Sequence, residues 1–543
     1  MSLLDSLPPG AAPDTDVVSS KVLINGSPLS NEIDLAQITI GKSFNKISWA
    51  KLVFIDGSAS DQDFALSDDD KFKPGNPITV QLGYQGETNT VFDGIIVKHA
   101  IKVRQNGQST MFIEAKDKAI KMAFPRNSAY YLNTKDSDVM EQLATGLETD
   151  IDDTKVTHSQ LVQYDCSNWD FVVTRAEANK MMVLTDDGKL IVKALSTSGD
   201  SVFTATYGSN IYEFEAEMDV RRQSESIISR SWDYTSQSPE ESDPGTTEFK
   251  ENGNVSADDL GRVLGANTVL MHSGHLTSPQ LQAWSDSYAL RNSLSKAVGR
   301  VRVEGNGDVK PGDMITLEGV GDRFNGDVLV TGILHQLDGD WYTDIQFGWR
   351  EEWFFTKEDV MAAPAAGLLP GINGLQTGRV TDLNDTDKGG QYRVKVEVPI
   401  IKSGETGIWA RVATLDAGDN RGTYFRPQKG DEVILGFLND DPREAIILGY
   451  LHSKSGKKSP LPIDTGALQY GYVSQEGVSM IFDDTNKRLT LTTPSGKAVI
   501  FNDDSKAISL SDEHGNSITM DGSGITIQSS AAITIKGATV AIN

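Results

Sequence analysis

The sequence predicts a mainly β protein composed of a hub, a small barrel and a C-terminal needle. Short alternating runs of Val, Ile and Thr, separated by Gly-rich turns, favour strands over most of the chain. Between about 375 and 450, the runs GRVTDL, QYRVKVEVP, GIWARVATL and KGDEVILGFL fit a closed Greek-key barrel of OB type. From Met480 onward, triplets of the form apolar-x-apolar recur, which indicates one short strand per repeat.

Length and composition indicate several folded domains without a nucleic-acid partner. The chain has 543 residues, of which 38% are hydrophobic and 23% are charged, whereas single cores rarely exceed about 250–300 residues. The formal net charge is -26, and so acidic a surface repels phosphate backbones. The one cysteine, Cys166, has no partner for an intrachain disulfide. We therefore expect stability to come from packing or from oligomerisation.

The N-terminal sequence carries no export signal. MSLLDSLPPGAAPDTD lacks the basic region and the apolar run of a signal peptide. No stretch of the chain approaches the roughly 20 apolar residues of a membrane helix. We expect the protein to be made and assembled in the cytoplasm, and to be carried out by something else if it leaves the cell.

An internal repeat organises the larger, N-terminal part of the chain. Residues 73–80 read KPGNPITV and residues 310–317 read KPGDMITL. An aromatic-polar-Gly turn follows each, at residues 92–94 and 324–326, and opens an alternating run that contains His99 or His335. The repeat predicts two related small β-barrels. We also expect a few helices, near 135–147, near 168–184 and from 281 onward.

The predicted domain boundaries follow changes in composition. A Pro/Gly/Ala-rich flexible arm at 1–19 precedes a hub at 20–361, with two barrel-like parts at about 20–125 and 195–355 and an α/β insert. A linker at 362–374 leads to the OB-fold domain at 375–453. An extended connector at 454–479 then leads to the needle at 480–543.

The needle repeat predicts a homotrimer. Its apolar pairs recur every 7 to 10 residues, and turn formers lie between them. A single-chain solenoid needs roughly 18 or more residues per coil, so this segment alone would leave much apolar edge exposed. Three intertwined chains, forming a triple-stranded β-helix shaped as a triangular prism, would close this edge. The predicted core residues are Met480, Phe482, Leu489, Leu491, Val499, Phe501, Ile508, Leu510, Ile518, Met520, Ile525, Ile527, Ile533 and Ile535.

The last apolar pair predicts a docking site at the needle tip. The final stretch, GITIQSSAAITIKGATVAIN, contains a single charge, that of Lys536. An open and uncharged strand edge requires a cover. The residues expected to bind a cap protein are Val540, Ala541, Ile542 and Asn543.

These stretches together resemble the VgrG family, the trimeric spike proteins of type VI secretion and of related contractile phage tails and extracellular injection particles. The resemblance depends chiefly on QYRVKVEVP, on WARVA at 409–413 and on RPQKGDEVILGFLNDDPREAIILGYL with the repeat after it. In the hub, VQYDCSNWDFVVTRAEAN, EFEAEMD and VKPGDMITLEGVGDRFNG extend the resemblance, which covers about residues 20–543.

The resemblance implies a structural central spike and tube-to-spike adaptor, not an enzyme. It implies that the hub docks a hexameric tube protein and baseplate proteins, and that a PAAR-repeat protein caps the needle. Such a spike would leave the cell as part of the particle and touch a target membrane only by piercing it. Type VI secretion and an extracellular injection particle both stay open.

Two other functions remain as alternatives. A phage-tail-like envelope-degrading enzyme would carry a catalytic domain between barrel and needle. Only about 30 residues separate Leu451 from Met480, whereas a domain takes about 50–200. A trimeric fibre or adhesin would carry a knob after the repeat, and this sequence ends within the repeat.

Residue types that could carry chemistry occur without a matching pattern. His272 and His275 flank a Gly and have no further metal ligands nearby in the sequence. Cys166 has no basic neighbour within two positions, which argues against a reactive thiol. DLNDTDKGG at 382–390 departs from the EF-hand spacing. Asp483 and Asp484 follow a repeat strand and indicate a turn. We expect no catalytic, metal or cofactor site.

Overall fold

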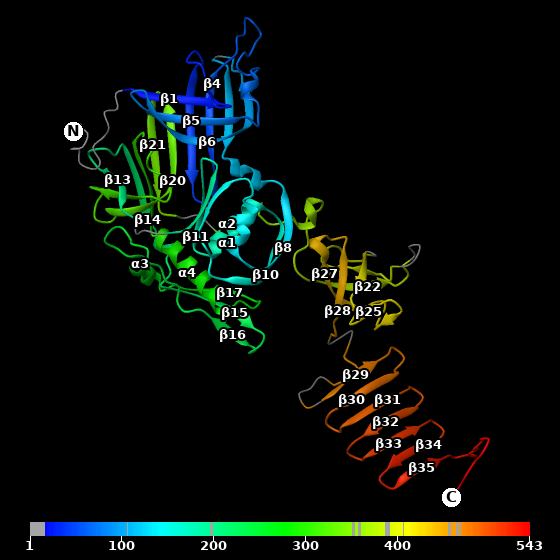
Figure 1. Cartoon of the computed structure of the whole chain (residues 1–543). Coiled ribbons are helices and arrows are strands. Elements are labelled where there is room, and N and C mark those ends of the chain that lie inside the picture. The colour runs from blue at the N-terminus through cyan, green and yellow to red at the C-terminus, as the bar shows by residue number, and fades with distance from the viewer. Residues whose placement is uncertain are drawn as a thin grey trace. The chain divides into compact units, whose positions relative to one another are not determined.

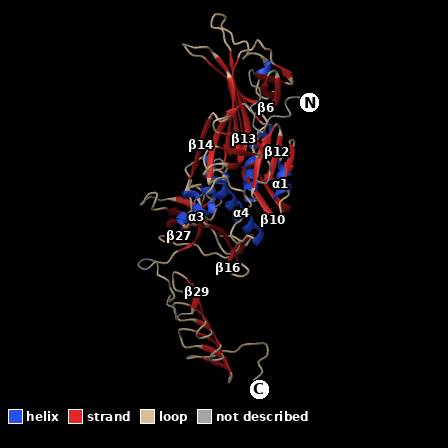
Figure 2. Cartoon of the chain, turned by 90° about the vertical axis from the view of Figure 1, so that its left-hand side faces the viewer, coloured by secondary structure: helices blue, strands red, loops and turns tan. Residues whose placement is uncertain are grey.

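The structure of the chain is a computed structural model. It describes residues 17–105, 107–195, 199–349, 353–356, 360–385, 391–404, 407–453, 458–462, 466 and 468–542. The chain divides into two compact units, Met1–Ala362 and Ala363–Asn543 (Figure 1). Strands predominate in both units (Figure 2), so the predicted mainly β fold is confirmed. The predicted arm lies outside the described residues except for its last three residues, 17–19.

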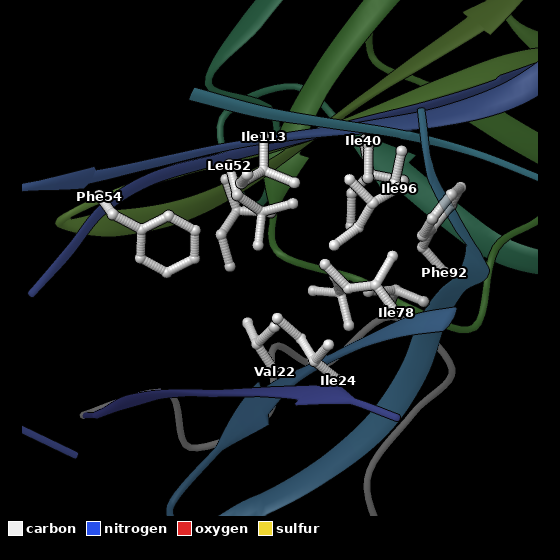
Figure 3. Packing of buried hydrophobic residues seen from close by; sticks show 14 of the residues in the cluster. Val22, Ile24, Ile40, Leu52, Phe54, Ile78, Phe92, Ile96 and Ile113 are labelled. Atoms are coloured by element: carbon white, nitrogen blue, oxygen red, sulfur yellow. The ribbon is translucent and has the colours of Figure 1, made fainter. Parts of the chain in front are cut away.

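The first half of the hub is an antiparallel sheet around one apolar core. Every second side chain of a strand points to the same face of the sheet. Leu52, Ile78, Phe92 and Ile113 therefore meet in this core (Figure 3). Its elements are β1 (Val18–Ile24), β2 (Ser27–Pro28), β3 (Leu35–Ser43), β4 (Lys46–Ile55), η2 (Asp70–Phe72), β5 (Pro77–Tyr84), β6 (Glu87–Lys102), β7 (Thr110–Lys116) and η3 (Lys118–Ala123).

The second half of the hub has its own core but shares the same sheet. Val301, Leu317 and Ile345 are buried in the second core. Strand β20 pairs with β3 of the first half, with His335 opposite Ile40, so one 13-stranded sheet joins both halves. The strands of the second half are β13 (Ser201–Thr206), β14 (Glu213–Met218), β18 (Ala297–Glu304), β19 (Met314–Glu318), β20 (Gly326–Asp338) and β21 (Asp340–Phe347).

Equivalent hydrogen bonds relate the two halves. In the first half, Thr79 donates from Oγ1 to Oδ1 of Asp93 over 2.7 Å. In the second half, Thr316 donates to Asp327 in the same way over 2.8 Å. The Pro-Gly turns match too, because the Gly75 and Gly312 amides donate to the carbonyl oxygens of Ile96 and Val330. The predicted relation between the two halves therefore extends to individual contacts.

The predicted turn at residues 92–94 is wrong, and the two histidines of the repeat occupy different positions. The stretch Phe92-Asp93-Gly94 lies inside β6, because the hairpin from β5 already closes at Gln85 and Gly86, where φ is positive. Gly94 instead allows β6 and β7 to lie close together, because a Cβ at this position would lie 2.2 Å from the carbonyl oxygen of Lys116 in β7. The two histidines are not equivalent either, because Asp93 matches Asp327 and this register does not bring His99 onto His335.

An α/β insert follows the first half. The second of the predicted helices begins at Ser167, whose side chain accepts a hydrogen bond from the Asp170 amide in the first turn. The insert consists of β8 (Arg126–Lys135), α1 (Asp136–Leu143), β9 (Glu148–Ile151), β10 (Thr157–Ser167), α2 (Asn168–Ala178), β11 (Met181–Asp186) and β12 (Lys189–Ala194). Strands β11, β12 and β9 form one sheet, and β10 pairs with β8.

A smaller helical layer interrupts the second half. Helix α4 (Ser278–Leu294) was predicted, whereas α3 (Ala257–Leu264) was not, because two turns are too short for a clear apolar period. A capping box between Ser256 and Asp259 and a left-handed Gly265 bound α3. The remaining elements are η4 (Val220–Arg222), β15 (Ser226–Asp233), β16 (Ser238–Glu241), β17 (Asn267–His272) and η5 (Phe354–Thr356).

The second unit begins with a closed five-stranded barrel, ordered β22-β23-β24-β28-β27. Val380, Val396, Leu435 and Ile447 are fully buried inside it. The elements are η6 (Pro364–Gly367), β22 (Gln376–Asp382), β23 (Val394–Glu397), β24 (Ile408–Val412), β25 (Ala417–Gly418), β26 (Arg421–Gly422), β27 (Glu432–Phe437), η7 (Leu438–Asp440) and β28 (Ala445–Tyr450). The barrel predicted from the short alternating runs is confirmed. Among the residues described in both units, no helix is long and apolar enough to cross a bilayer.

Candidate functional site

The C-terminal sheet is a meander of seven antiparallel strands, each paired with its neighbours in sequence (Figure 1). Its strands are β29 (Gln469–Val473), β30 (Ser479–Asp483), β31 (Arg488–Thr492), β32 (Ala498–Asn502), β33 (Ala507–Ser511), β34 (Ser517–Asp521) and β35 (Gly524–Gln528). Every strand has five residues, so its second and fourth side chains point to one face and the others to the opposite face.

Direct pairing across the strands arranges the apolar triplets into two parallel ladders. One ladder runs through Tyr472, Met480, Leu491, Val499, Leu510, Ile518 and Ile527. The other ladder runs through Tyr470, Phe482, Leu489, Phe501, Ile508, Met520 and Ile525. The structure therefore brings the predicted core residues from 480 to 527 onto one face, which we call the ladder face.

The ladder face is uncharged and uncovered within one chain. Most of its side chains are more than a third exposed, from Ile518 and Met520 at 37% to Ile525 at 70%. A groove of about 860 Å³ runs over it, lined by Met480, Leu491, Leu510 and Ile518 among others. An exposed apolar surface of this extent marks an interaction site. At the strand centres, the opposite face carries Thr490, Ser509, Thr519 and Thr526, together with Gly471, Ile481 and Ile500.

Sequence reasoning missed the first strand of this sheet. The predicted connector, 454–479, contains β29, whose Tyr470 and Tyr472 head the two ladders. The signal was present, because Tyr470-Gly471-Tyr472 has the same apolar-x-apolar form ten residues before Met480. Gly471 also lets β30 approach closely: a Cβ there would lie 2.2 Å from the Met480 carbonyl oxygen. The other connector residues are described only at 458–462, 466, 468 and 474–478.

The turns between strands are held by acidic side chains. Asp483 is buried and accepts hydrogen bonds from Gln469 and from both the amide and the side chain of Asn486. The bonds from Asn486 hold the pKa of Asp483 below its usual range. Asp512 accepts from Asn516 in the same manner. Asp483 therefore fixes a turn, as expected, and is engaged there instead of pairing with Asp484.

Backbone pairing differs from the interchain pairing that the sequence predicted. Strands β29 to β35 satisfy their inner N–H and C=O groups within one chain, because turns of a few residues allow hairpins. What the ladder face lacks is a cover for its side chains. Beyond Gln528, residues 529–542 form no strand, and Ile533, Ile535, Val540 and Ile542 are exposed. Asn543 lies outside the described residues.

The other candidate residues do not converge on a reactive centre. In the part of the chain that the structure describes, no group of three or more His, Cys, Asp or Glu side chains is arranged to hold a metal ion. His272 contacts the Gly274 carbonyl oxygen, while His275 lies 3.7 Å from Asp233. Cys166 is buried, and burial raises the pKa of its thiol. The loop 382–390 is described only up to residue 385.

His335 is buried in the hub sheet and is held neutral. Its Nδ1 lies 3.0 Å from Oγ1 of Thr343. Burial, assisted by the charge of Lys42, lowers the pKa of His335 to about 3. A neutral, enclosed imidazole fits a packing role between β20 and β21.

Three family models match the chain. Residues 14–339, more than half of the chain, match the Alg8 N-terminal domain. Residues 376–452 match the type VI secretion system/phage-baseplate injector OB domain. Residues 488–543, which include strands β31 to β35, match the phage baseplate V C-terminal trimerisation domain.

Individual relatives are similar over parts of the chain. The type VI secretion system spike protein VgrG5 of Pseudomonas aeruginosa is 32% identical over 127 residues, which cover 22% of this chain and 16% of that protein. The 43 kDa tail protein of prophage MuSo2 from Shewanella oneidensis is 12% identical, with a TM-score of 0.46, over 61% of this chain and 98% of that one. The E. coli c3393 protein, a type VI secretion component, is 14% identical, with a TM-score of 0.41, over 79% and 100%.

Proposed function

We infer that three copies of this chain, which belongs to the Alg8 N-terminal domain family, form the central spike of a contractile injection machine. The grounds are its matches to the injector OB domain, to the C-terminal trimerisation domain and to the spike protein VgrG5. In this proposal the C-terminal sheets of the three copies form the needle. The match to VgrG5 spans about one sixth of that protein, so the machine-level role rests on the features of this chain.

The observation that carries the proposal is the uncharged double ladder on one face of the C-terminal sheet. Three such sheets around a threefold axis would turn their ladder faces inward and form a triangular prism. Each pair of ladder residues, such as Phe482 and Met480, would meet its two symmetry copies in one layer. At about 25 cal/mol per Å² of apolar surface removed from water, seven strands of such layers give a strongly associated rod. The Thr- and Ser-rich opposite face would meet solvent.

The needle serves a mechanical function in this proposal. Contraction of a sheath would drive the spike against a target envelope, and strands paired along the whole sheet would resist bending. No bond is made or broken by the spike. The interval between β28 and β29, residues 451–468, is too short for an inserted catalytic domain of about 50–200 residues.

We propose the individual binding partners from the resemblance to VgrG spike proteins. The hub would dock a hexameric tube protein and baseplate proteins, and the exposed residues Val540, Ala541 and Ile542, with Asn543, would dock a PAAR-repeat cap. Assembly would take place in the cytoplasm, and the spike would leave the cell with the particle.

The trimer is tested by the mass of the purified full-length chain. Light scattering should give about three times 59.0 kDa, with no concentration dependence down to the micromolar range, because the buried ladder faces make the contact tight. A single species at 59.0 kDa would contradict the proposal.

The tip is tested by placing charge on the exposed terminal pair. The double variant Val540→Asp and Ile542→Asp should lose capture of the machine's PAAR-repeat protein, because two carboxylates would be buried under the cap without partners. Thr539→Asp, one residue outside the pair, is the matched control and should still capture it. The mass of the trimer should stay unchanged in both. Capture by the double variant would show that the cap docks elsewhere.

A further inference from the structure

A two-stranded ribbon of the hub insert carries an exposed aromatic face. Strands β8 and β10 pair antiparallel, with Tyr130 opposite Val162 and Tyr131 opposite Leu161 (Figure 1). The inward side chains, including Tyr131, pack with Cys166 and Phe171 into a small core. Tyr131 also donates from its hydroxyl to the Gln163 side chain over 2.8 Å. The inner contacts fix which side chains point outward.

The outward side chains are large, apolar and uncovered. Tyr130 is 82% exposed and Tyr164 is 68% exposed, and Leu132 and Val162 lie beside them on the same face. We call Tyr130, Leu132, Val162 and Tyr164 the ribbon patch. None of them is charged, although the chain carries a net charge of -26.

The size of the ribbon patch indicates a contact that needs support from elsewhere. An aromatic side chain carries about 150–250 Å² of surface, so the patch exposes on the order of 500 Å². This matches the largest patch on a typical monomer, which is often functional. It falls short of the roughly 800 Å² that each partner buries in an independent, stable complex. A partner already held nearby would therefore fit best.

We propose that the ribbon patch packs against the hub of a second copy of this chain. This inference rests on the proposed trimer, because the needle holds two other hubs on the same assembly at high effective concentration. Electrostatics favour the same occupant. Copies with a net charge of -26 each repel one another except where the facing surfaces are neutral. The ribbon patch is such a surface. Under threefold symmetry it meets a different surface of the next copy.

The test is a site-specific photo-cross-link in the full-length chain. Replacing Tyr130 by p-benzoyl-phenylalanine keeps an aromatic ring at an exposed position, so folding is preserved. Irradiation should give a covalent product at twice 59.0 kDa, formed from two copies. The same replacement at Tyr207, which is 69% exposed in the second half of the hub, is the matched control and should give markedly less of this product.

The outcomes separate this inference from the proposed function. A trimer by light scattering without a Tyr130 cross-link between copies overturns the ribbon contact and leaves the spike intact. A cross-link from Tyr130 only to another protein added with the machine's components also overturns it. A monomer by light scattering overturns both. As a second measurement, hydroxyl-radical oxidation of Tyr130 and Tyr164 should rise several-fold when the trimer is dissociated; equal oxidation in both states contradicts the contact.

Discussion

Replacing Leu491 with glutamate is expected to convert the trimer into monomers. Leu491 lies within one ladder, paired with Met480 on one side and Val499 on the other. In the prism, three carboxylates would meet on the axis without cationic partners. Burying an unpaired charge costs several kcal/mol per ion even after relaxation, and like charges raise this cost further. Light scattering should shift from three times 59.0 kDa to 59.0 kDa.

The neighbouring residue supplies the control. Thr490 lies on the same strand, but its side chain points to the opposite face of the sheet. Thr490→Glu should therefore leave the mass at three copies. The hub should fold normally in both variants, which near-ultraviolet circular dichroism can verify. If both variants stay trimeric, the ladder face is not the interface; if both dissociate, charge on either face is disruptive and the assignment of faces is wrong.

The strands of the C-terminal sheet could be predicted from the sequence because their signal is local. A strand repeats its side-chain direction every two residues, so each apolar-x-apolar triplet reveals both a strand and its buried face. Phe482 and Leu489 belong to different triplets, yet the short turn between them determines that they pair. The same apolar-x-apolar triplets arise whether strands pair within one chain or between chains. The sequence therefore predicts strands but does not distinguish intertwined chains from the pairing within one chain that the structure shows.

Long-range contacts in the hub were beyond sequence reasoning. The Pro-Gly turns indicate a repeat in the sequence. They do not indicate that β3 pairs with β20, which joins residues almost 300 positions apart. No local pattern encodes such a pairing. The ribbon patch could not be predicted for a related reason. Each face of β10 carries both apolar and polar residues, so the sequence does not show which face is buried. Only the packing of α2 against one face shows which residues stay exposed.

Replacing Asp136 with alanine is expected to destabilise the hub by about 3 kcal/mol or more. The carboxylate is 1% exposed and accepts from Nε2 of His158 at 2.8 Å, from Nε of Arg175 at 2.6 Å and from Nδ2 of Asn179 at 2.9 Å. It thus ties α1 to β10 and α2. Removing it leaves a guanidinium and two polar groups without their acceptor. Urea denaturation followed through tryptophan fluorescence, with Trp169 buried in α2, should show an earlier transition of the hub.

The effect of Asp136→Ala should depend on pH in a defined direction. Burial alone would raise the pKa of Asp136, but hydrogen bonds from His158, Arg175 and Asn179 outweigh it and hold the pKa well below its usual range. A carboxyl group with a lowered folded pKa stabilises fully above its unfolded value of about 3.9. That contribution is lost as the pH falls toward the folded pKa. The contribution of the Asp136 carboxylate to the difference between wild type and variant should therefore shrink below about pH 4.

An exposed carboxylate on the same insert provides the comparison. Asp153 pairs with Lys135 over 2.7 Å at the surface, with its side chain 72% exposed. Solvent screens such a pair, so Asp153→Ala should lower the stability of the hub far less than Asp136→Ala does. An Asp136→Ala variant no less stable than Asp153→Ala would show that the buried cluster does not hold the insert together. Because the ladder faces are proposed to hold the trimer together, both variants should still form trimers under native conditions, which separates hub stability from assembly.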